Sequence, residues 1–320
     1  SAIREGFSDL RPGADYEALY QSALCRQKAD WLVGINATRL FSVLYHRTLN
    51  VGRVQTPTLA MLAERDAKIT LFHKEKYHLL RLVLDGAEAV SEKFTDLAEA
   101  EQAAAMCKGA AVTCTSVTKE QKKEQPPKLY DLTTLQREAN RLFGYTAKQT
   151  LDYAQSLYEK KLLTYPRTDS RYLTSDMEET ASCVIHLVAK LPPFDGCGNF
   201  FPLVEAMSSD KDVSDHHAII PTMEIEKADI KALPLGERNL FLLVCCKLLC
   251  ASAEPYVYEA VTVTFDCGGH SFTAKGKCIL SEGWREIDRI FRASLKERPA
   301  DEDGGTLPDF TEGQTFDGAE

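Results

Sequence analysis

The chain has 320 residues, of which 44% are hydrophobic and 27% are charged, a composition typical of soluble globular proteins. This composition excludes fibres, collagen-like repeats and wholesale disorder, and the length predicts two or three domains. No apolar run approaches the roughly 20 residues of a membrane-spanning helix, and the N-terminus lacks a signal-peptide pattern. Because the chain does not begin with Met, we expect it to be cut from a longer protein.

The net charge is −9, from 38 basic and 47 acidic residues, so nucleic-acid binding would require a local reversal of sign. Residues 118–171 provide one, with eleven basic and seven acidic side chains, about +4. A solvated face of mixed charge explains this stretch equally well. The ten cysteines form no C-x-x-C pair and sit mostly among apolar neighbours, which predicts reduced core thiols and argues against a zinc site.

The first seventy residues predict helices. Apolar spacing over 15–47 indicates one or two long helices, and Thr56 as N-cap with Pro57 in the first turn predicts another that runs toward Ile69. Strands are predicted at 77–84, 112–118 and 256–265, with a hairpin turn at Gly268-Gly269. Because these strands flank a largely helical insert, we expect one discontinuous β domain with a helical domain inserted into it.

Two helices with clear ends open the insert. Asp131 can cap the first and Gly144 can end it, and Thr146 with Gln149 forms a capping-box pattern for the second. The short connection predicts a helix-turn-helix, a motif that often binds DNA, although helical hairpins without that function are common.

Three short segments carry candidate chemistry. If the chain is extended at 165–167, Tyr165 and Arg167 share a face. The arginine can then bind a phosphate, and the phenol can donate a hydrogen bond to it or attack it. Alternatively, the two side chains only pack against the protein and contact solvent. Asp215-His216-His217 could ligate a metal, but a histidine that donates to a phosphate or is satisfied by the protein fits better. Arg53 and Gln55, placed before a helix N-terminus, could contact either a backbone phosphate or a base edge of a nucleic acid.

Together these segments resemble type IA DNA topoisomerases. The matching motifs are NVGRVQTPTL at 50–59, LTYPRTDS at 163–170 and HHAIIPT at 216–222, in family order, with ADWLVGINATR at 29–39 as a further match. The proline after the tyrosine and the His-His-Ala form are similar to the topoisomerase III branch.

The resemblance implies a multidomain α+β fold, a toroid-type core with a helical base, a β arch and a winged-helix-like catalytic domain. We assign residues 1–70 to the helical base, 71–125 with 256–320 to the discontinuous arch, and 126–255 to the winged-helix-like domain. It also implies that Tyr165 cleaves one strand as a 5′-phosphotyrosine, without ATP, while Arg167 and His216 assist at the phosphate. The implied single-strand contacts are Trp31, Arg39, Asn50, Val51, Gly52, Arg53, Val54 and Gln55.

One family feature does not appear in the sequence. The resemblance implies Mg²⁺ bound by acidic residues of an N-terminal Toprim domain, and no matching cluster is present, since Asp301-Glu302-Asp303 does not fit it. We therefore expect a fragment without the metal site that is inactive alone. For the full protein we expect single-stranded DNA as substrate, a helicase as partner, a monomeric state and a cytoplasmic, nucleoid-associated location. The alternatives are a DNA-binding module without catalysis and a metal-dependent phosphodiesterase that uses Asp215 and His216.

Overall fold

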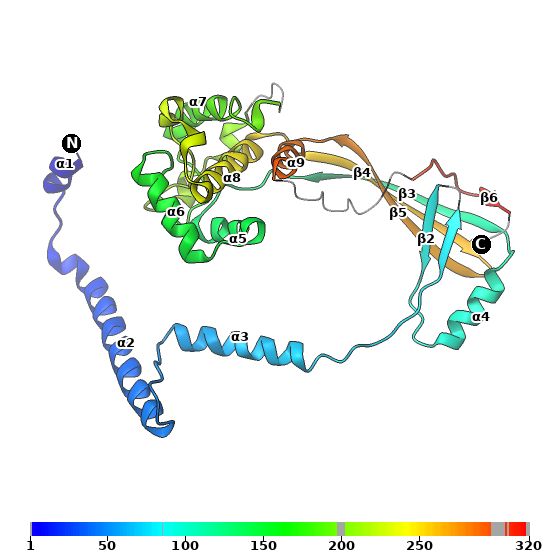
Figure 1. The fold of residues 1–320 in the computed structure, drawn as a ribbon, viewed down its shortest axis with the longest axis horizontal. Coiled ribbons are helices and arrows are strands. Elements are labelled where there is room, and N and C mark those ends of the chain that lie inside the picture. Colours follow the sequence, from blue (N-terminus) through cyan, green and yellow to red (C-terminus); the bar gives the residue numbers. More distant parts are fainter. Residues whose placement is uncertain (1, 85, 197–201, 296–304, 306, 318–320) are drawn as a thin grey trace. The chain divides into compact units, whose positions relative to one another are not determined.

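The computed structural model describes residues 2–84, 86–196, 202–295, 305 and 307–317. They belong to two compact units, residues 1–76 and residues 77–320 (Figure 1). None of the helices described is long and apolar enough to cross a membrane.

The described part of the first unit is helical. Its elements are α1 (Ala2–Ser8), a 3-10 helix (Gly13–Tyr16), α2 (Glu17–Leu44) and α3 (Gln55–Thr70). The two predicted helical regions are therefore confirmed, but no residue of α2 or α3 is buried within this unit. Trp31, for example, is 63% exposed. The apolar side chains of these helices thus form no core of their own.

The start of α3 differs from the prediction. The helix begins at Gln55 with Val54 as its N-cap, ahead of Pro57. The Thr56 hydroxyl does not cap the helix and instead accepts a hydrogen bond from the Gly52 amide at 3.1 Å. Because Gln55 is already helical, the alternation that was expected to put Arg53 and Gln55 on one side of an extended chain does not apply.

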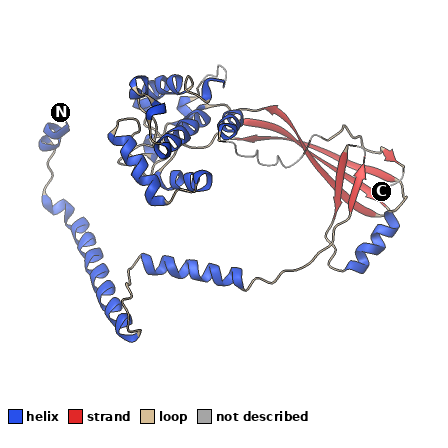
Figure 2. Ribbon diagram, in the orientation of Figure 1, coloured by secondary structure: helices blue, strands red, loops and turns tan. Residues whose placement is uncertain are grey.

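The second unit contains a six-stranded antiparallel sheet in the order β1-β2-β5-β4-β3-β6. Figure 2 shows its strands in red. Its strands come from both ends of the unit, on either side of the helical insert, as the strand pattern predicted. Both glycines of the β4–β5 hairpin, Gly268 and Gly269, have positive φ, which the predicted turn requires. The strand bounds are β1 (Arg81–Leu84), β2 (Ala87–Ser91), β3 (Val112–Glu124), β4 (Tyr256–Cys267), β5 (His270–Ser281) and β6 (Thr315–Phe316).

The helices of the insert share one hydrophobic core, which is separate from the core that the sheet forms with α4. Asp131 and Thr146 cap α5 and α6 as predicted, the capping box with Gln149 is present, and Gly144 ends α5 in the left-handed conformation. The α-helices of this unit are α4 (Leu97–Cys107), α5 (Leu132–Phe143), α6 (Ala147–Glu159), α7 (Glu178–Val188), α8 (Leu235–Ser252) and α9 (Trp284–Ser294), with 3-10 helices at Ser175–Met177, Phe194–Gly196, Val204–Met207, Asp210–Asp212, Met223–Lys227 and Ile230–Ala232.

Helix α9 packs in the helical core. It follows β5 in the chain, yet Ile287 and Phe291 are buried in the helical core. At its start, the Trp284 indole donates to the Glu124 carbonyl at 3.3 Å and Arg285 pairs with the Glu124 carboxylate at 2.6 Å. The range 256–320 assigned to the arch therefore includes a helix that packs with the insert.

The cysteines only partly follow the prediction of core thiols. Nine are free thiols, and of these Cys25, Cys183 and Cys278 are exposed while six are buried. Cys197 lies outside the described residues.

Candidate active site

The segment that carries Tyr165 is joined to the segment that carries the histidines. Leu163 forms an antiparallel bridge with Pro221, and the backbone amides of Thr164 and Thr222 donate to the carbonyls of Ile220 and Leu162 at 3.0 and 3.1 Å. Two motifs about fifty residues apart in the chain therefore lie side by side.

Two threonine side chains strengthen this pairing. The Thr164 hydroxyl donates to the Ala218 carbonyl at 3.1 Å and accepts from the Ile220 amide at 3.0 Å. The Thr168 hydroxyl donates to the His216 carbonyl at 2.8 Å. These residues position the histidine segment from within the tyrosine motif. Their role cannot be predicted from the sequence, because a hydroxyl gives no sign of a partner so distant in the chain.

The pairing brings Tyr165 and His216 together. Their ring centroids are 4.5 Å apart at an interplanar angle of 49°, and Tyr158, from the last turn of α6, meets Tyr165 edge-on at 5.5 Å. Tyr165 is half-buried and His216 is exposed. The phenol that the sequence singled out thus lies between an imidazole and a second tyrosine.

Arg167 lies at the surface two residues further on. Pro166, Thr168 and Ser170 are buried while Arg167 and Asp169 are exposed, an alternation typical of extended chain. Tyr165 lies two residues before Arg167, so in this alternation the two side chains lie on the same side of the segment. Within the described part of the chain, the Arg167 guanidinium has no carboxylate within ion-pairing distance, so it is available to an anionic ligand.

A pocket of about 530 Å³ opens beside the tyrosine. Tyr165, Tyr158 and His217 line it together with residues of α7 and of the segment after His217. Burial lowers the pKa of His217 below its ordinary value, although the contact between its Nδ1 and the Ala218 carbonyl at 2.8 Å opposes this shift. The lowered pKa favours the neutral form of His217, and in the tautomer that donates Nδ1–H to that carbonyl its Nε2 is a hydrogen-bond acceptor.

Metal ligation by Asp215 and His216 finds no support in the geometry. Among the residues described, no three His, Cys, Asp or Glu side chains are grouped closely enough to hold a metal ion. The Asp301–Asp303 acids considered in the sequence lie outside the described residues.

In the helical unit, the segment before α3 is hydrogen-bonded to side chains of α2. The Leu49 amide donates to the Ser42 hydroxyl at 3.0 Å, and the Val51 amide donates to the Thr38 hydroxyl at 2.9 Å. Next in this series, Arg53 Nε donates to the Asp30 carboxylate. That hydrogen bond is the main reason why the pKa of Asp30 is lowered and the pKa of Arg53 is raised. Trp31 and Arg39 are exposed on the same helix.

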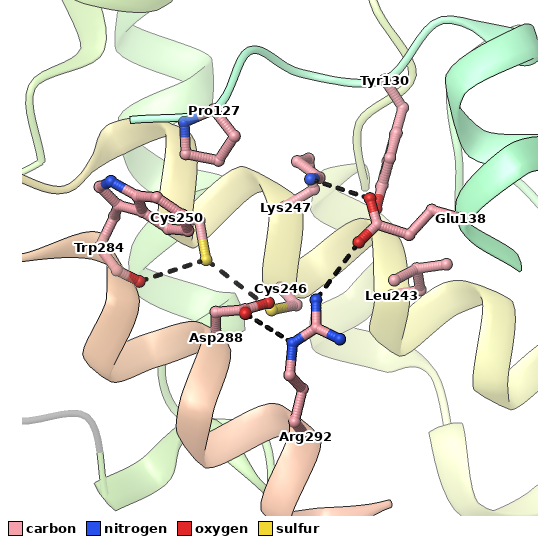
Figure 3. A pocket seen from close by; sticks show the side chains of 10 residues that line it. All are labelled: Pro127, Tyr130, Glu138, Leu243, Cys246, Lys247, Cys250, Trp284, Asp288 and Arg292. Carbon is pink, nitrogen blue, oxygen red and sulfur yellow. Dashed lines mark hydrogen bonds and ion pairs between the residues drawn. The ribbon is translucent and has the colours of Figure 1, made fainter. Parts of the chain in front are cut away.

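A second, smaller pocket of about 150 Å³ lies where α5, α8 and α9 meet (Figure 3). Its charged groups are already paired. Glu138 accepts a hydrogen bond from the Tyr130 hydroxyl at 2.8 Å and forms ion pairs with Lys247 at 3.2 Å and Arg292 at 3.5 Å. Asp288 also holds Arg292 at 2.6 Å. We therefore interpret this pocket as a structural junction between α5, α8 and α9.

Comparison with known proteins gives the family. A family model described as DNA topoisomerase matches residues 14–320. DNA topoisomerase 3 of Bacillus licheniformis and of Bacillus subtilis are each 39% identical over 98% of this chain and 44% of their own length. That of Bacillus thuringiensis strain Al Hakam is 40% identical over 89% of this chain and 41% of its own length. The chain thus spans less than half of each of these relatives.

A solved structure has a similar fold. Full-length topoisomerase I from Thermotoga maritima superimposes with a TM-score of 0.70 over 99% of this chain and 51% of that chain, at 24% identity. The mixed α/β architecture is therefore shared. On the family match and the topoisomerase 3 relatives together, the chain belongs to the type IA DNA topoisomerases, and within them it is similar to topoisomerase III.

Proposed function

We propose that this chain carries the strand-cleaving tyrosine of a type IA topoisomerase, and that the tyrosine is Tyr165. The observation that carries the proposal is the position of its half-exposed ring, at a pocket and 4.5 Å from the His216 ring. A nucleophile must reach its substrate, and this phenol can.

The proposed reaction is a transesterification on single-stranded DNA. The Tyr165 oxygen attacks phosphorus, the bond from phosphorus to the 3′ oxygen breaks, and the 5′ phosphate becomes joined to the tyrosine. The phenolic proton leaves Tyr165 and the departing 3′ oxygen gains a proton. Because one phosphoester bond replaces another, the reverse step reseals the strand without ATP.

The side chains around Tyr165 suit this step. A phenol keeps its proton at pH 7, so a neighbouring base or cation must favour its ionisation. His216 contacts the ring and can exchange a proton with bound water or substrate. Arg167, exposed and without an ion pair in the described chain, can stabilise charge on the phosphoryl oxygens. We propose these two as catalytic residues.

The remaining parts of the proposal concern binding. Asn50–Gln55, with Trp31 and Arg39, would contact the single strand. Mg²⁺ is expected in this family, but the described residues offer no carboxylate cluster for it, so no step here depends on a metal held by this chain. We propose that the portion of the relatives not matched by this chain supplies that site and that the chain alone completes no relaxation. A helicase partner, a monomeric state and association with the nucleoid remain predictions.

The test is covalent trapping. The complete protein is incubated with Mg²⁺ and a labelled single-stranded oligonucleotide, then resolved on a denaturing gel. We expect a labelled protein band that is absent in Tyr165→Phe and retained in Tyr158→Phe, which alters the neighbouring phenol in the same way. A band that survives Tyr165→Phe would refute the assignment.

A further inference from the structure

The pocket beside Tyr165 is larger than a reacting phosphate needs. Its volume of about 530 Å³ falls within the roughly 300–1,000 Å³ of small-molecule sites. Apolar side chains, among them Leu163, Val184 and Ile220, form much of its wall. Tyr158 and Tyr165 supply aromatic surface and His217 supplies a neutral ring. Such a lining suits a flat, heteroaromatic group rather than a second anion.

A lysine stands at this pocket in an unusual backbone conformation. Lys161 lines it with φ of 61°, in the left-handed region that favours glycine or asparagine. The conformation is fixed from both sides, since the Lys161 amide donates to the Tyr158 carbonyl at 2.8 Å and its carbonyl accepts from the Thr222 hydroxyl. Its side chain is exposed.

The charge of Lys161 is available to a ligand. Of the described residues that line the pocket, it alone carries a fixed positive charge. The acidic side chain there, Glu224, forms its ion pair with Lys227 instead. A lysine thus occupies a position beside an apolar pocket where the left-handed backbone favours glycine or asparagine.

We propose that this pocket is a subsite for one unstacked nucleobase of the DNA strand, with Lys161 on the phosphate next to that base. The inference rests on the proposed function, because a strand whose phosphate reaches the Tyr165 hydroxyl brings its flanking nucleotide to the same pocket. Aromatic side chains bind unstacked bases of any sequence through their faces. With Nδ1 bonded to Ala218, Nε2 of His217 can accept from the exocyclic amine of adenine, cytosine or guanine, a group that thymine lacks.

The phosphate contact is tested with Lys161→Asn. Asparagine tolerates the left-handed conformation, so the melting temperature should not fall. Binding of a fluorescent single-stranded oligonucleotide is measured by anisotropy across a salt series. We expect the slope of log affinity against log salt to become shallower by about 0.7, the contribution of one phosphate contact on a single strand. Lys148→Asn removes the same charge from α6 outside the pocket and should leave the slope unchanged.

The base contact is tested with Thr180→Trp, which fills the pocket from an exposed position of α7. We expect affinity for an ordinary oligonucleotide to fall by about fivefold, the lower end of one base–aromatic stack, and affinity for an abasic strand of equal length to stay constant. Glu179→Trp, exposed on the same helix and outside the lining, should change neither.

The outcomes separate the two proposals. If Thr180→Trp and Lys161→Asn bind both strands like the unaltered protein while Tyr165 still forms its covalent adduct, the subsite is refuted and the proposed function stands. If the unaltered protein neither binds single strands nor forms the adduct, both are refuted. Equal loss on ordinary and abasic strands would also refute the base pocket.

Discussion

The junction in Figure 3 predicts a large and pH-dependent loss of stability for Glu138→Gln. The side chains of Glu138 and Lys247 are only 22% and 17% exposed, and their ion pair measures 3.2 Å. The amide can still accept from Tyr130, but it cannot balance the charges of Lys247 and Arg292. Removing one partner of a fully buried pair costs about 3–5 kcal/mol, and an exposed pair is worth about 0–1. For this largely buried site we expect a loss of about 2–3 kcal/mol in the free energy of unfolding at pH 7.

The pH dependence gives a second, independent test. Burial alone would raise the pKa of Glu138, but Lys247, the Tyr130 hydroxyl and Arg141 outweigh it and lower the pKa below its ordinary value. A carboxylate whose pKa is lowered on folding stabilises the protein above its unfolded pKa, and the effect is lost as pH falls through the folded value. The difference in the free energy of unfolding between Glu138→Gln and the unaltered protein should therefore become smaller below about pH 4.

Urea unfolding followed by circular dichroism measures both effects. Arg141→Ala serves as control, because Arg141 pairs with the same carboxylate at 3.3 Å but is 55% exposed. It should cost less than about 0.5 kcal/mol. A loss for Glu138→Gln no larger than that of the control, or one that stays constant down to pH 3, would refute the reasoning.

Two further predictions follow from single contacts. Thr168→Val removes the hydroxyl that donates to the His216 carbonyl at 2.8 Å; we expect adduct formation by the complete protein to fall about tenfold while unfolding loses only about 1 kcal/mol. Equal adduct yield would contradict the positioning role. Gly283→Ala puts a Cβ into the carbonyl oxygens of Glu254 and Pro255 at a φ of 48°. We expect a loss of about 2 kcal/mol or more in the free energy of unfolding, and an unchanged melting temperature would show that the turn relaxes freely.

The elements that the sequence predicts well are those whose determinants are local. Asp131, Gly144 and Thr146 act on backbone groups within a few residues, so the ends of α5 and α6 follow from the pattern itself. The same holds for the glycine hairpin between β4 and β5. At α3 a local rule failed, because Thr56 satisfies the Gly52 amide and Gln55 joins the helix ahead of it.

The candidate site shows the opposite case. Its tyrosine and histidine were identified through motifs, yet their contact depends on a pairing between segments more than fifty residues apart. Thr164 and Thr168 strengthen that pairing with hydroxyls that could equally have faced solvent. The left-handed conformation of Lys161 also has no local signature, because lysine gives no indication of positive φ. Sequence patterns indicated which residues matter, and only the structure indicated what holds them.

The attachment of the Arg53 segment to α2 has a simple geometric basis. The partners on α2 are Asp30, Thr38 and Ser42, and Gly34, whose Cα faces the Val51 carbonyl, completes a series with a spacing of four. Four helical residues rise about 6.0 Å and two extended residues about 6.6 Å, so Leu49 and Val51 meet successive turns of α2 at Ser42 and Thr38, and the longer Arg53 side chain reaches past Gly34 to Asp30. The bond to Asp30 uses only Nε of Arg53. Within the described residues its terminal nitrogens have no hydrogen-bond partner and are available for a phosphate, so Asp30 orients this arginine without blocking it.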